Sequence, residues 1–462
     1  MVYSNPTFNA PCVQMRIVNH NNSKGENYEW NGYAYQTKED AFNAVKNFYN
    51  GCFIRNESES TNKFLKYIYF FACKNGTENF TPISTRPPRG TARYAPSMST
   101  NSPRTGSYEA ISINETIKWQ FPIKVNIYWY VLTDEVKDAI KLIQENTCVK
   151  IDIVDYKIEN DYGINIIYDF PCRSDRIGRN PNKKPNIIQL NRRCWYDTVK
   201  IQAFILEALG LYPEQTRTDR DKYVGIDLCE VKFEYKYFFN INSNKNTSFY
   251  NTNYDYGSVM HYYSKAFSKH EVLDTIIPIS EHQNYYIKMI GQSRMVGFND
   301  YRLVNLYYCN NKCKKPTTVC WRNGYPNPNN CSLCLCPYPF QGKKCQNWAA
   351  NFNYCPIRHV TAVPAGSIIE FSGYSACYGY IEAKRNKRIK IVIEKSNLDK
   401  SYPCATSVNS IEIKYKKDLS LMGVCFCEPV YNYEVISETN YSLLIYRGYY
   451  YYNEVRVRYY EV

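Results

Sequence analysis

The sequence predicts a multidomain chain with a central α+β domain of two subdomains, a small disulfide-rich module and a carboxy-terminal antiparallel β-sandwich. Three observations lead to this expectation. From about residue 113 to 309, stretches with strand alternation and stretches with helical spacing follow one another. Most of the 19 cysteines lie from Cys309 onward, at short spacing. After residue 355 the chain repeats short β-rich runs such as "IIEFSGY", "KIVIEK" and "SIEIKY".

The overall charge is basic, with 57 Lys and Arg against 43 Asp and Glu and a net charge of +14. A positive balance favours acidic surfaces as partners and says nothing about the fold. No apolar run reaches the ~20 residues that a membrane helix needs. We therefore expect no membrane span, and acidic glycans or proteins rather than nucleic acid as partners.

Cysteine usage and glycosylation sequons point to an oxidising compartment. Dense cysteines in a short polar stretch are typical of a disulfide framework. Asn114, Asn246 and Asn440 each begin an N-x-S/T sequon. The first residues, "MVYSNPTFNAPCVQMRIVNHNNS", lack the apolar core of a signal peptide. We expect a secreted protein whose natural start differs from the one given.

The amino-terminal part is expected to be a small α+β segment of unknown role over residues 1–85. "KEDAFNAVKNFYNG" has helical spacing and "FLKYIYFFACK" reads as a strand. Cys52 and Cys73 are the best candidate metal-ligand pair there, but no histidines follow them, so a metal site is not expected. Residues 86–112 are rich in Pro, Ser, Thr, Arg and Gly, which indicates a linker.

The central domain begins with "IKVNIYWYVL", which alternates as a strand. "DEVKDAIKLIQENT" follows with helical spacing and an acidic first turn, and "YGINIIYDF" is a further strand. A long helix is expected from about Asp197 to Leu209, with Gly210 placed to end it.

This long helix has the frame of the zinc motif H-E-x-x-H-x-x-G-x-x-H. Histidines at positions i and i+4 share one helix face and can hold Zn²⁺, while the Glu activates water. A glycine then turns the chain so that a third histidine can bind. With Gly210 as the anchor, the three histidine positions hold Ala203, Glu207 and Pro213, and the Glu position holds Phe204.

The surroundings of this motif carry a family resemblance. "EQTRTDRDKYV" follows Pro213, "YDYGSVMHYYSKAFS" lies forty residues on, and "TCVKI", "CRSDRIGR" and "YRLVNLYYC" flank them. With these motifs, residues 113–309 resemble an astacin-family zinc metalloendopeptidase domain, which implies a metzincin-type fold of two subdomains. The resemblance implies a Met-turn at Met260, a transition-state tyrosine at Tyr262, and disulfides in the pairs Cys148–Cys309 and Cys172–Cys194.

The chemistry of the family site is expected to be lost. None of the five histidines lies on the helix. Glu207 and Tyr262 do not make a tetrahedral zinc site, and without a general base water is not activated. We therefore expect no cofactor and no catalytic residue, and a pseudoprotease in place of a peptidase.

Two further modules are expected after the central domain. Residues 310–347 resemble an EGF-like module and residues 355–462 a CUB domain, an order similar to that of nematode astacins. In the CUB-like part, Cys404 pairs with Cys425 or Cys427, of which we take Cys425. The remaining expected pairs are Cys313–Cys331, Cys320–Cys334, Cys336–Cys345 and Cys355–Cys377. The sequence does not fix the pairing of Cys12, Cys52, Cys73, Cys229 and Cys427.

Three functions remain open at this stage. The first is a secreted, inactive astacin-like protein that binds extracellular proteins or acidic glycans through its CUB-like domain and its degenerate cleft. In it, "YGINIIYDF" is taken as a cleft edge strand that pairs with an extended peptide. The second is an active zinc endopeptidase with a non-standard site at Glu207, Tyr262 and Glu214. The third is a structural or adhesive protein that uses the EGF-like and CUB-like modules, with the best basic patch in "AKRNKRIKIVIEK".

Overall fold

The computed structural model describes residues 110–241, 247–248, 250–313, 318–350, 355 and 359–462, together with three short strands nearer the amino terminus. The described chain divides into two compact units. One comprises Met1–Gly106 with Gly225–Glu230, and the other comprises Ser107–Val224 with Val231–Val462. The expected early helix and strand, the linker up to residue 109, Cys52 and Cys73 lie outside the described residues.

In the first unit, the described strands form one antiparallel sheet in the order β1-β2-β3. Ile17 pairs with Tyr28, and Glu29 pairs with Ala34. The strands are β1 (Arg16–Val18), β2 (Asn27–Trp30) and β3 (Tyr33–Tyr35).

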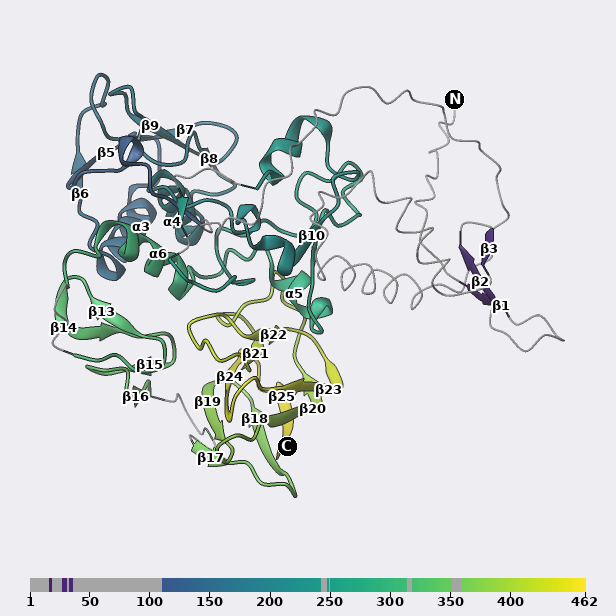
Figure 1. The fold of residues 1–462 in the computed structure, drawn as a ribbon. Helices are drawn as coiled ribbons and strands as arrows, with labels where there is room; N and C mark the ends of the chain where they lie inside the picture. Colours follow the sequence, from purple (N-terminus) through teal and green to yellow (C-terminus); the bar gives the residue numbers. More distant parts are fainter. Residues whose placement is uncertain are drawn as a thin grey trace, which may run out of the picture. The chain divides into compact units, whose positions relative to one another are not determined.

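The second unit begins with a five-stranded sheet in the order β6-β5-β7-β9-β8 (Figure 1). All neighbouring pairs are parallel except β8 with β9. The strands are β5 (Ile123–Ile127), β6 (Ile151–Val154), β7 (Ile164–Tyr168), β8 (Arg173–Ser174) and β9 (Asn186–Leu190).

The position of β7 corrects one sequence-based prediction. "YGINIIYDF" was expected to be a cleft edge strand, yet β7 pairs with β5 on one side and with β9 on the other. Its backbone groups are already used within the sheet, so it has no free edge for a peptide. The edges of this sheet are β6 and the short antiparallel strand β8.

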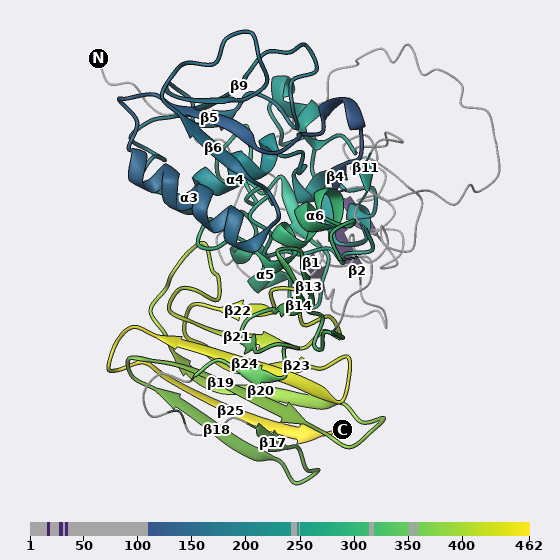
Figure 2. The same ribbon diagram turned by 90° about the vertical axis from the view of Figure 1, so that its left-hand side faces the viewer.

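Helix α3 (Thr133–Asn146) forms because its apolar residues recur at helical spacing. Val136, Ala139, Ile140 and Ile143 are buried, and the acidic residues of the first turn complement the helix dipole. These four side chains share one core cluster with residues of β5, β7, β9 and α4 (Thr198–Ala208). Figure 2 shows α3 and α4 close to this sheet. The expected helices at both places are confirmed.

Short elements precede β5 and follow α4. β4 pairs with β11, and two longer helices, α5 and α6, follow. The elements are β4 (Ile111–Ser112), η1 (Glu115–Ile117), η2 (Glu214–Thr216), η3 (Arg220–Lys222), β10 (Val224–Ile226), η4 (Phe233–Phe239), β11 (Thr247–Ser248), β12 (Ile276–Pro278), α5 (Gln283–Met289) and α6 (Phe298–Tyr308).

Two disulfides join parts of this region that are distant in sequence. Cys148, just after α3, bonds to Cys309 at the end of α6. Cys172, ahead of β8, bonds to Cys194 after β9. Both are the pairs that the family resemblance implies.

A cysteine-rich module follows, with two small antiparallel hairpins. Its disulfides are Cys313–Cys331, Cys320–Cys334 and Cys336–Cys345, the three pairs expected from the sequence. The strands are β13 (Tyr325–Asn327), β14 (Asn330–Leu335), β15 (Phe340–Gln341) and β16 (Asn347–Trp348).

The carboxy-terminal domain consists of two sheets, of orders β17-β19-β24-β21-β22 and β18-β25-β20-β23 (Figures 1 and 2). Burial alternates along β20 and β25, as expected when one face of a sheet packs on a core. Only β17 and β19 pair in parallel within these sheets. The strands are β17 (His359–Thr361), β18 (Ser367–Ser372), β19 (Ser375–Glu382), β20 (Ile389–Asn397), β21 (Ser410–Lys414), β22 (Val424–Phe426), β23 (Val430–Ile436), β24 (Tyr441–Gly448) and β25 (Glu454–Glu461).

The cysteines of this domain correct a second prediction. Cys355 bonds to Cys377 as expected, but Cys404 bonds to Cys427 and not to Cys425. Cys425 is a free, buried thiol on β22. Cys229, whose pairing the sequence left open, is disulfide-bonded.

The expected basic patch lies in the exposed turn between β19 and β20. Lys384, Arg385, Lys387 and Arg388 are all exposed there. In the part of the chain that the structure describes, no helix has both the length and the apolar character to cross a membrane.

Candidate functional site

Helix α4 presents the predicted site, and its two ends have clear physical causes. Asp197 is the N-cap, and its Oδ1 accepts a hydrogen bond from the Lys200 backbone N–H at 3.0 Å. At the other end Gly210 adopts φ +106°, a left-handed conformation that favours glycine. The helix therefore stops where a zinc-type helix would turn back.

The four predicted positions lie on α4 and just after it. Ala203, Phe204 and Glu207 are half-buried, and Pro213 is buried. Ala203 and Phe204 pack against the core cluster of the domain. Ala203 and Glu207 are four residues apart and so share one helix face. Of the four side chains, only Glu207 carries an atom that can bind a metal.

Glu207 is held in a site that disfavours its charged form. Burial raises the pKa of its carboxyl to about 8, and the negative charge of Asp175 adds to the rise. In the absence of a cation, the site therefore disfavours the charged form of Glu207.

The Met-turn residues occupy structural positions. Met260 is buried in the core cluster, and its carbonyl accepts a hydrogen bond from the Glu214 backbone N–H at 3.2 Å. Tyr262 lies against two aromatic rings, with centroid distances of 6.4 Å to Phe239 and 5.7 Å to Phe267. Burial, with Glu207 nearby, raises the pKa of the Tyr262 phenol well above its usual range.

His261 is a neutral core histidine in the same turn. Its Nδ1 donates to the Tyr262 carbonyl at 2.7 Å, because a carbonyl can only accept. Its Nε2 therefore accepts from the Tyr254 hydroxyl, also at 2.7 Å. Burial lowers the pKa of His261 to about 4, so this histidine serves packing and not metal binding.

The acidic and basic residues after Pro213 form a buried network. The Arg217 guanidinium is 3.1 Å from Glu214 Oε1 and 2.8 Å from Asp219 Oδ1, and it donates to the Thr252 carbonyl at 3.0 Å. Arg220 donates to the carbonyls of Gln215 and Phe239. Arg217 and Arg220 are among the most buried side chains of the described chain.

This network connects the segment after α4 to the Met-turn. Glu214 Oε1 also accepts from the Asp255 backbone N–H at 3.0 Å. Burial raises the pKa of Glu214 to about 7 despite the opposing charge of Arg217. The residues after Pro213 and those of the Met-turn are thus joined by hydrogen bonds and ion pairs that support the fold.

The zinc ion that the resemblance implies does not fit these residues. Structural and catalytic zinc sites use at least three protein ligands of the N, S or O type. Alanine, phenylalanine and proline side chains supply none. Among the residues that the structure describes, no group of three His, Cys, Asp or Glu side chains is arranged to hold a metal ion.

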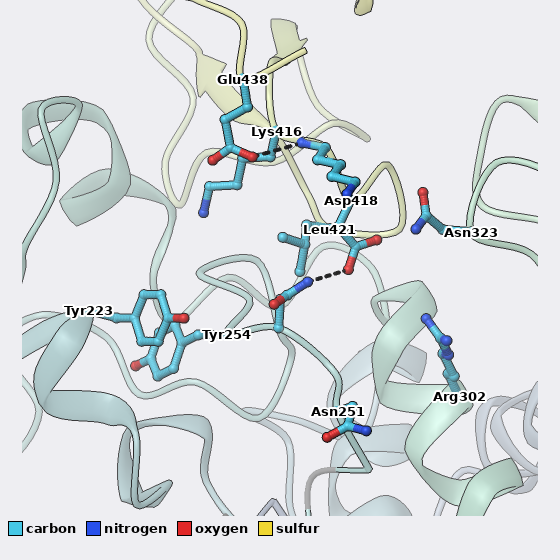
Figure 3. A pocket seen from close by; sticks show the side chains of 11 residues that line it. Tyr223, Asn251, Tyr254, Arg302, Asn323, Lys416, Asp418, Leu421 and Glu438 are labelled. Atoms are coloured by element: carbon cyan, nitrogen blue, oxygen red, sulfur yellow. Dashed lines mark hydrogen bonds between the residues drawn. The ribbon is translucent and has the colours of Figure 1, made fainter.

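A separate pocket of about 500 Å³ lies beside the network (Figure 3). Tyr223 and Tyr254 stack there at 4.7 Å, and Arg302 of α6 lies at another side. Asp418 of the carboxy-terminal domain accepts from Asn253 Nδ2 at 2.8 Å. The volume falls in the range of small-molecule sites, and sequence reasoning gave no sign of this pocket because its walls come from distant segments.

Comparisons with known proteins agree with the motifs. The family model described as Astacin, a peptidase family, matches residues 113–309. The chain is 35% identical over 241 residues to zinc metalloproteinase nas-34 of Caenorhabditis elegans, a match that covers 52% of this chain and 38% of that protein. It is 30% identical over 346 residues to zinc metalloproteinase nas-36 of Brugia malayi, covering 72% of this chain and 57% of that protein.

Among solved structures, the chain is similar to high choriolytic enzyme 1, a hatching enzyme zinc-protease from the medaka Oryzias latipes. The identity is 28% and the TM-score 0.37, with 42% of this chain and 96% of that chain covered. The chain thus spans between 38% and 57% of the length of the two curated relatives described above. Through residues 113–309, the chain belongs to the astacin family of zinc metalloproteases.

Proposed function

We propose that this chain is a non-catalytic astacin-family protein that binds partners without cutting them. The observation that carries the proposal is the donor set at the zinc position. Ala203, Phe204 and Pro213 offer no ligand atom, which leaves Glu207 as the single possible ligand of the four. A single weak ligand does not hold zinc at the affinity that catalysis needs.

The family's general-base position has lost its function as well. A general base must lie within hydrogen-bond reach of the attacking water and have a pKa near the working pH. Phe204 stands at the family's base position and cannot accept a proton. Tyr262 remains, but the raised pKa of its phenol keeps it neutral and unable to act as a base.

The proposal is tested by hydrolysis of unfolded casein, with and without a chelator. We expect the same rate of casein cleavage with and without the chelator, at the level of the background. Tyr262→Phe and Glu207→Ala should leave the background rate unchanged. Chelator-sensitive cleavage that either substitution removes would establish the alternative, an active endopeptidase with a non-standard site.

We also infer an extracellular location and the identity of the two carboxy-terminal modules. Three short-range disulfides within residues 313–345 support an EGF-like module. Two stacked, mainly antiparallel sheets with two disulfides support a CUB-like domain over residues 355–462. Disulfides of this density persist in oxidising compartments. Expression in secreting cells, with mass spectrometry of glycans at Asn114 and Asn440, tests the location.

One observation favours a second candidate function, adhesion through the carboxy-terminal domain. Tyr449, Tyr450, Tyr451 and Tyr452 are all exposed in the turn between β24 and β25, and Tyr451 is 94% exposed. Exposed tyrosines are common anchors in protein interfaces. If this turn binds matrix, Tyr450→Ala with Tyr451→Ala should abolish retention on extracellular matrix while the folded domain is kept.

A further inference from the structure

A continuous set of aromatic side chains lies at one edge of the parallel sheet. β5 ends at Ile127 and β7 ends at Tyr168, and the chain after β9 returns to the same edge. The carboxyl ends of parallel strands meet at one edge, which is where open α/β sheets bind ligands. The aromatic surface consists of Tyr128, Trp129, Tyr130, Tyr168, Trp195 and Tyr196.

The rings of the aromatic surface contact one another in sequence. Each ring centroid lies between 5.1 and 5.7 Å from the next along the series from Tyr128 to Tyr196. Neighbouring ring planes are tilted by 44° to 89°. The surface is therefore corrugated and not a flat stacking platform.

Most of these rings are open to solvent. Trp129 is 76% exposed and Tyr196 68% exposed, whereas Trp195 is buried and anchors the set. Contiguous exposed apolar area of this kind is unusual on a folded domain and marks an interaction site. Among the described residues, the parallel sheet and its helices leave these rings uncovered.

One end of the aromatic surface is positively charged. Arg192 and Arg193 are exposed beside Tyr196, and they line a pocket of about 410 Å³ together with Arg294. The Arg193 guanidinium lies 5.6 Å from the Phe170 ring centroid. Within the described part of the chain, the guanidinium groups of Arg192 and Arg193 form no ion pair and no hydrogen bond; only the Arg193 backbone N–H donates, to Asn191 Oδ1.

The one carboxylate of this pocket does not cancel that charge. Asp197 is already engaged as the N-cap of α4, and it also lies 3.6 Å from Lys200 Nζ. The pocket therefore keeps an excess of positive charge and would attract an acidic group.

We propose that the aromatic surface and its arginine end bind an extended protein segment in which apolar side chains are combined with a carboxylate. Tryptophan, tyrosine and arginine are the residues that contribute most to protein–protein binding energy. The apolar side chains pack between the tilted rings, and the carboxylate meets Arg192 and Arg193. The inference rests on the proposed binding function and assigns it a surface.

Two other partners fit the surface less well. A sulfated glycan needs many cations along its length, and here the cations are confined to one end while rings make up the rest. A neutral sugar chain stacks best on exposed ring faces that lie parallel, whereas these planes are strongly tilted.

The test uses the full chain and two pools of short fluorescein-labelled synthetic peptides. In one pool Leu, Phe and Pro alternate with Glu, and in the other Lys replaces every Glu. We expect fluorescence anisotropy to show saturable binding of the Glu pool and little binding of the Lys pool. Trp129→Ala and Tyr196→Ala should each weaken binding about tenfold or more.

Matched variants separate the surface from general effects. Phe233→Ala removes a ring on η4 that is 84% exposed and outside the aromatic surface, and it should change nothing. Arg193→Gln should weaken the Glu pool and reduce the salt dependence of its binding. The proposal is overturned if both pools bind equally or if neither binds. It is also overturned if heparin, tested in the same way, is the only ligand that binds, or if Trp129→Ala binds the Glu pool like the parent.

The same preparations distinguish this proposal from the proposed function. Zinc content and casein cleavage are measured on the parent and on Trp129→Ala. If zinc and cleavage are found while the Glu pool still depends on Trp129, the non-catalytic function is wrong and the aromatic surface stands. If both are absent and the Glu pool does not bind, the aromatic surface is wrong and the non-catalytic function stands.

Discussion

Replacement of Arg217 by methionine tests whether the retained frame around the lost zinc position supports the fold. Arg217 is buried, with its side chain only 1% exposed, and its two carboxylate partners, Glu214 and Asp219, are 5% and 10% exposed. Methionine keeps much of the side-chain volume and removes the charge and all donors. The substitution therefore leaves both carboxylates without this cation and removes one hydrogen bond to the Thr252 carbonyl.

The expected loss of stability is large. Removal of one partner from a buried ion pair typically costs about 3–5 kcal/mol, because the remaining charge stays buried and unpaired. Glu214 can take up a proton, since its pKa is already about 7, which keeps the loss toward the lower end of this range. The matched control is Arg176→Met, which breaks a half-exposed pair with Asp175 and should cost less than about 1 kcal/mol.

The assay is guanidinium chloride unfolding followed by the fluorescence of Trp119 and Trp195, both buried in the central domain. Adding Glu214→Gln to Arg217→Met removes one of the two abandoned charges. The double variant should therefore lose less stability than the sum of the two single variants. An Arg217→Met protein as stable as the Arg176→Met control would refute the structural role of the network.

Three further outcomes are expected. Burial lowers the pKa of His282 to about 4, so its contribution to stability is present above pH ~6.5 and is lost as the pH falls toward 4. Urea unfolding of the parent and of His282→Gln measures this contribution. Relative to the variant, the parent should lose about 1–3 kcal/mol of unfolding free energy between pH 7 and 4.5. Cys427→Ala opens the disulfide across a separation of 23 residues and should cost about 3 kcal/mol, whereas Cys425→Ala should leave the disulfide intact in a non-reducing peptide map. Native Cys425 is buried with a raised thiol pKa and should resist a thiol reagent until the protein unfolds.

Much of the central domain could be predicted because local signals agree with the fold. The i, i+3, i+4, i+7 spacing of Val136, Ala139, Ile140 and Ile143 predicts α3, and Gly210 marks the end of α4. The site could be located in the same way, since spacing from one glycine identifies every position of the motif. The present roles of Ala203, Phe204, Glu207 and Pro213 follow from the chemistry and burial of their side chains.

The errors concern information that is not local. Strand order in a sheet is set by pairing between distant segments, so "YGINIIYDF" was placed at an edge. The run "INII" held the correct signal, because strands of a parallel sheet are apolar on both faces. Cys425 and Cys427 are two residues apart on an extended chain and therefore face the same side. In the structure, Cys425 lies on β22 opposite Glu412 of β21, whereas Cys427 follows the strand and bonds to Cys404.

The aromatic surface was missed because its first rings were included in a strand. Alternation predicts one strand over "IKVNIYWYVL", but β5 ends at Ile127 and the next three residues turn toward α3. Three consecutive aromatic residues do not fit strict alternation, and this was the available signal. That Tyr168 and Trp195 join them could not be predicted, because it depends on the strand order.

The central claim is that the zinc position has lost its ligands while its frame remains. It is tested by zinc content per chain, measured in metal-controlled buffer for the parent and for a variant carrying Ala203→His, Phe204→Glu, Glu207→His and Pro213→His. The difference between the two proteins excludes any metal held elsewhere, for example by Cys52 and Cys73. Our account predicts about one more zinc per chain in the variant than in the parent. A parent that already holds a zinc ion, and loses it on Glu207→Ala, would contradict the account.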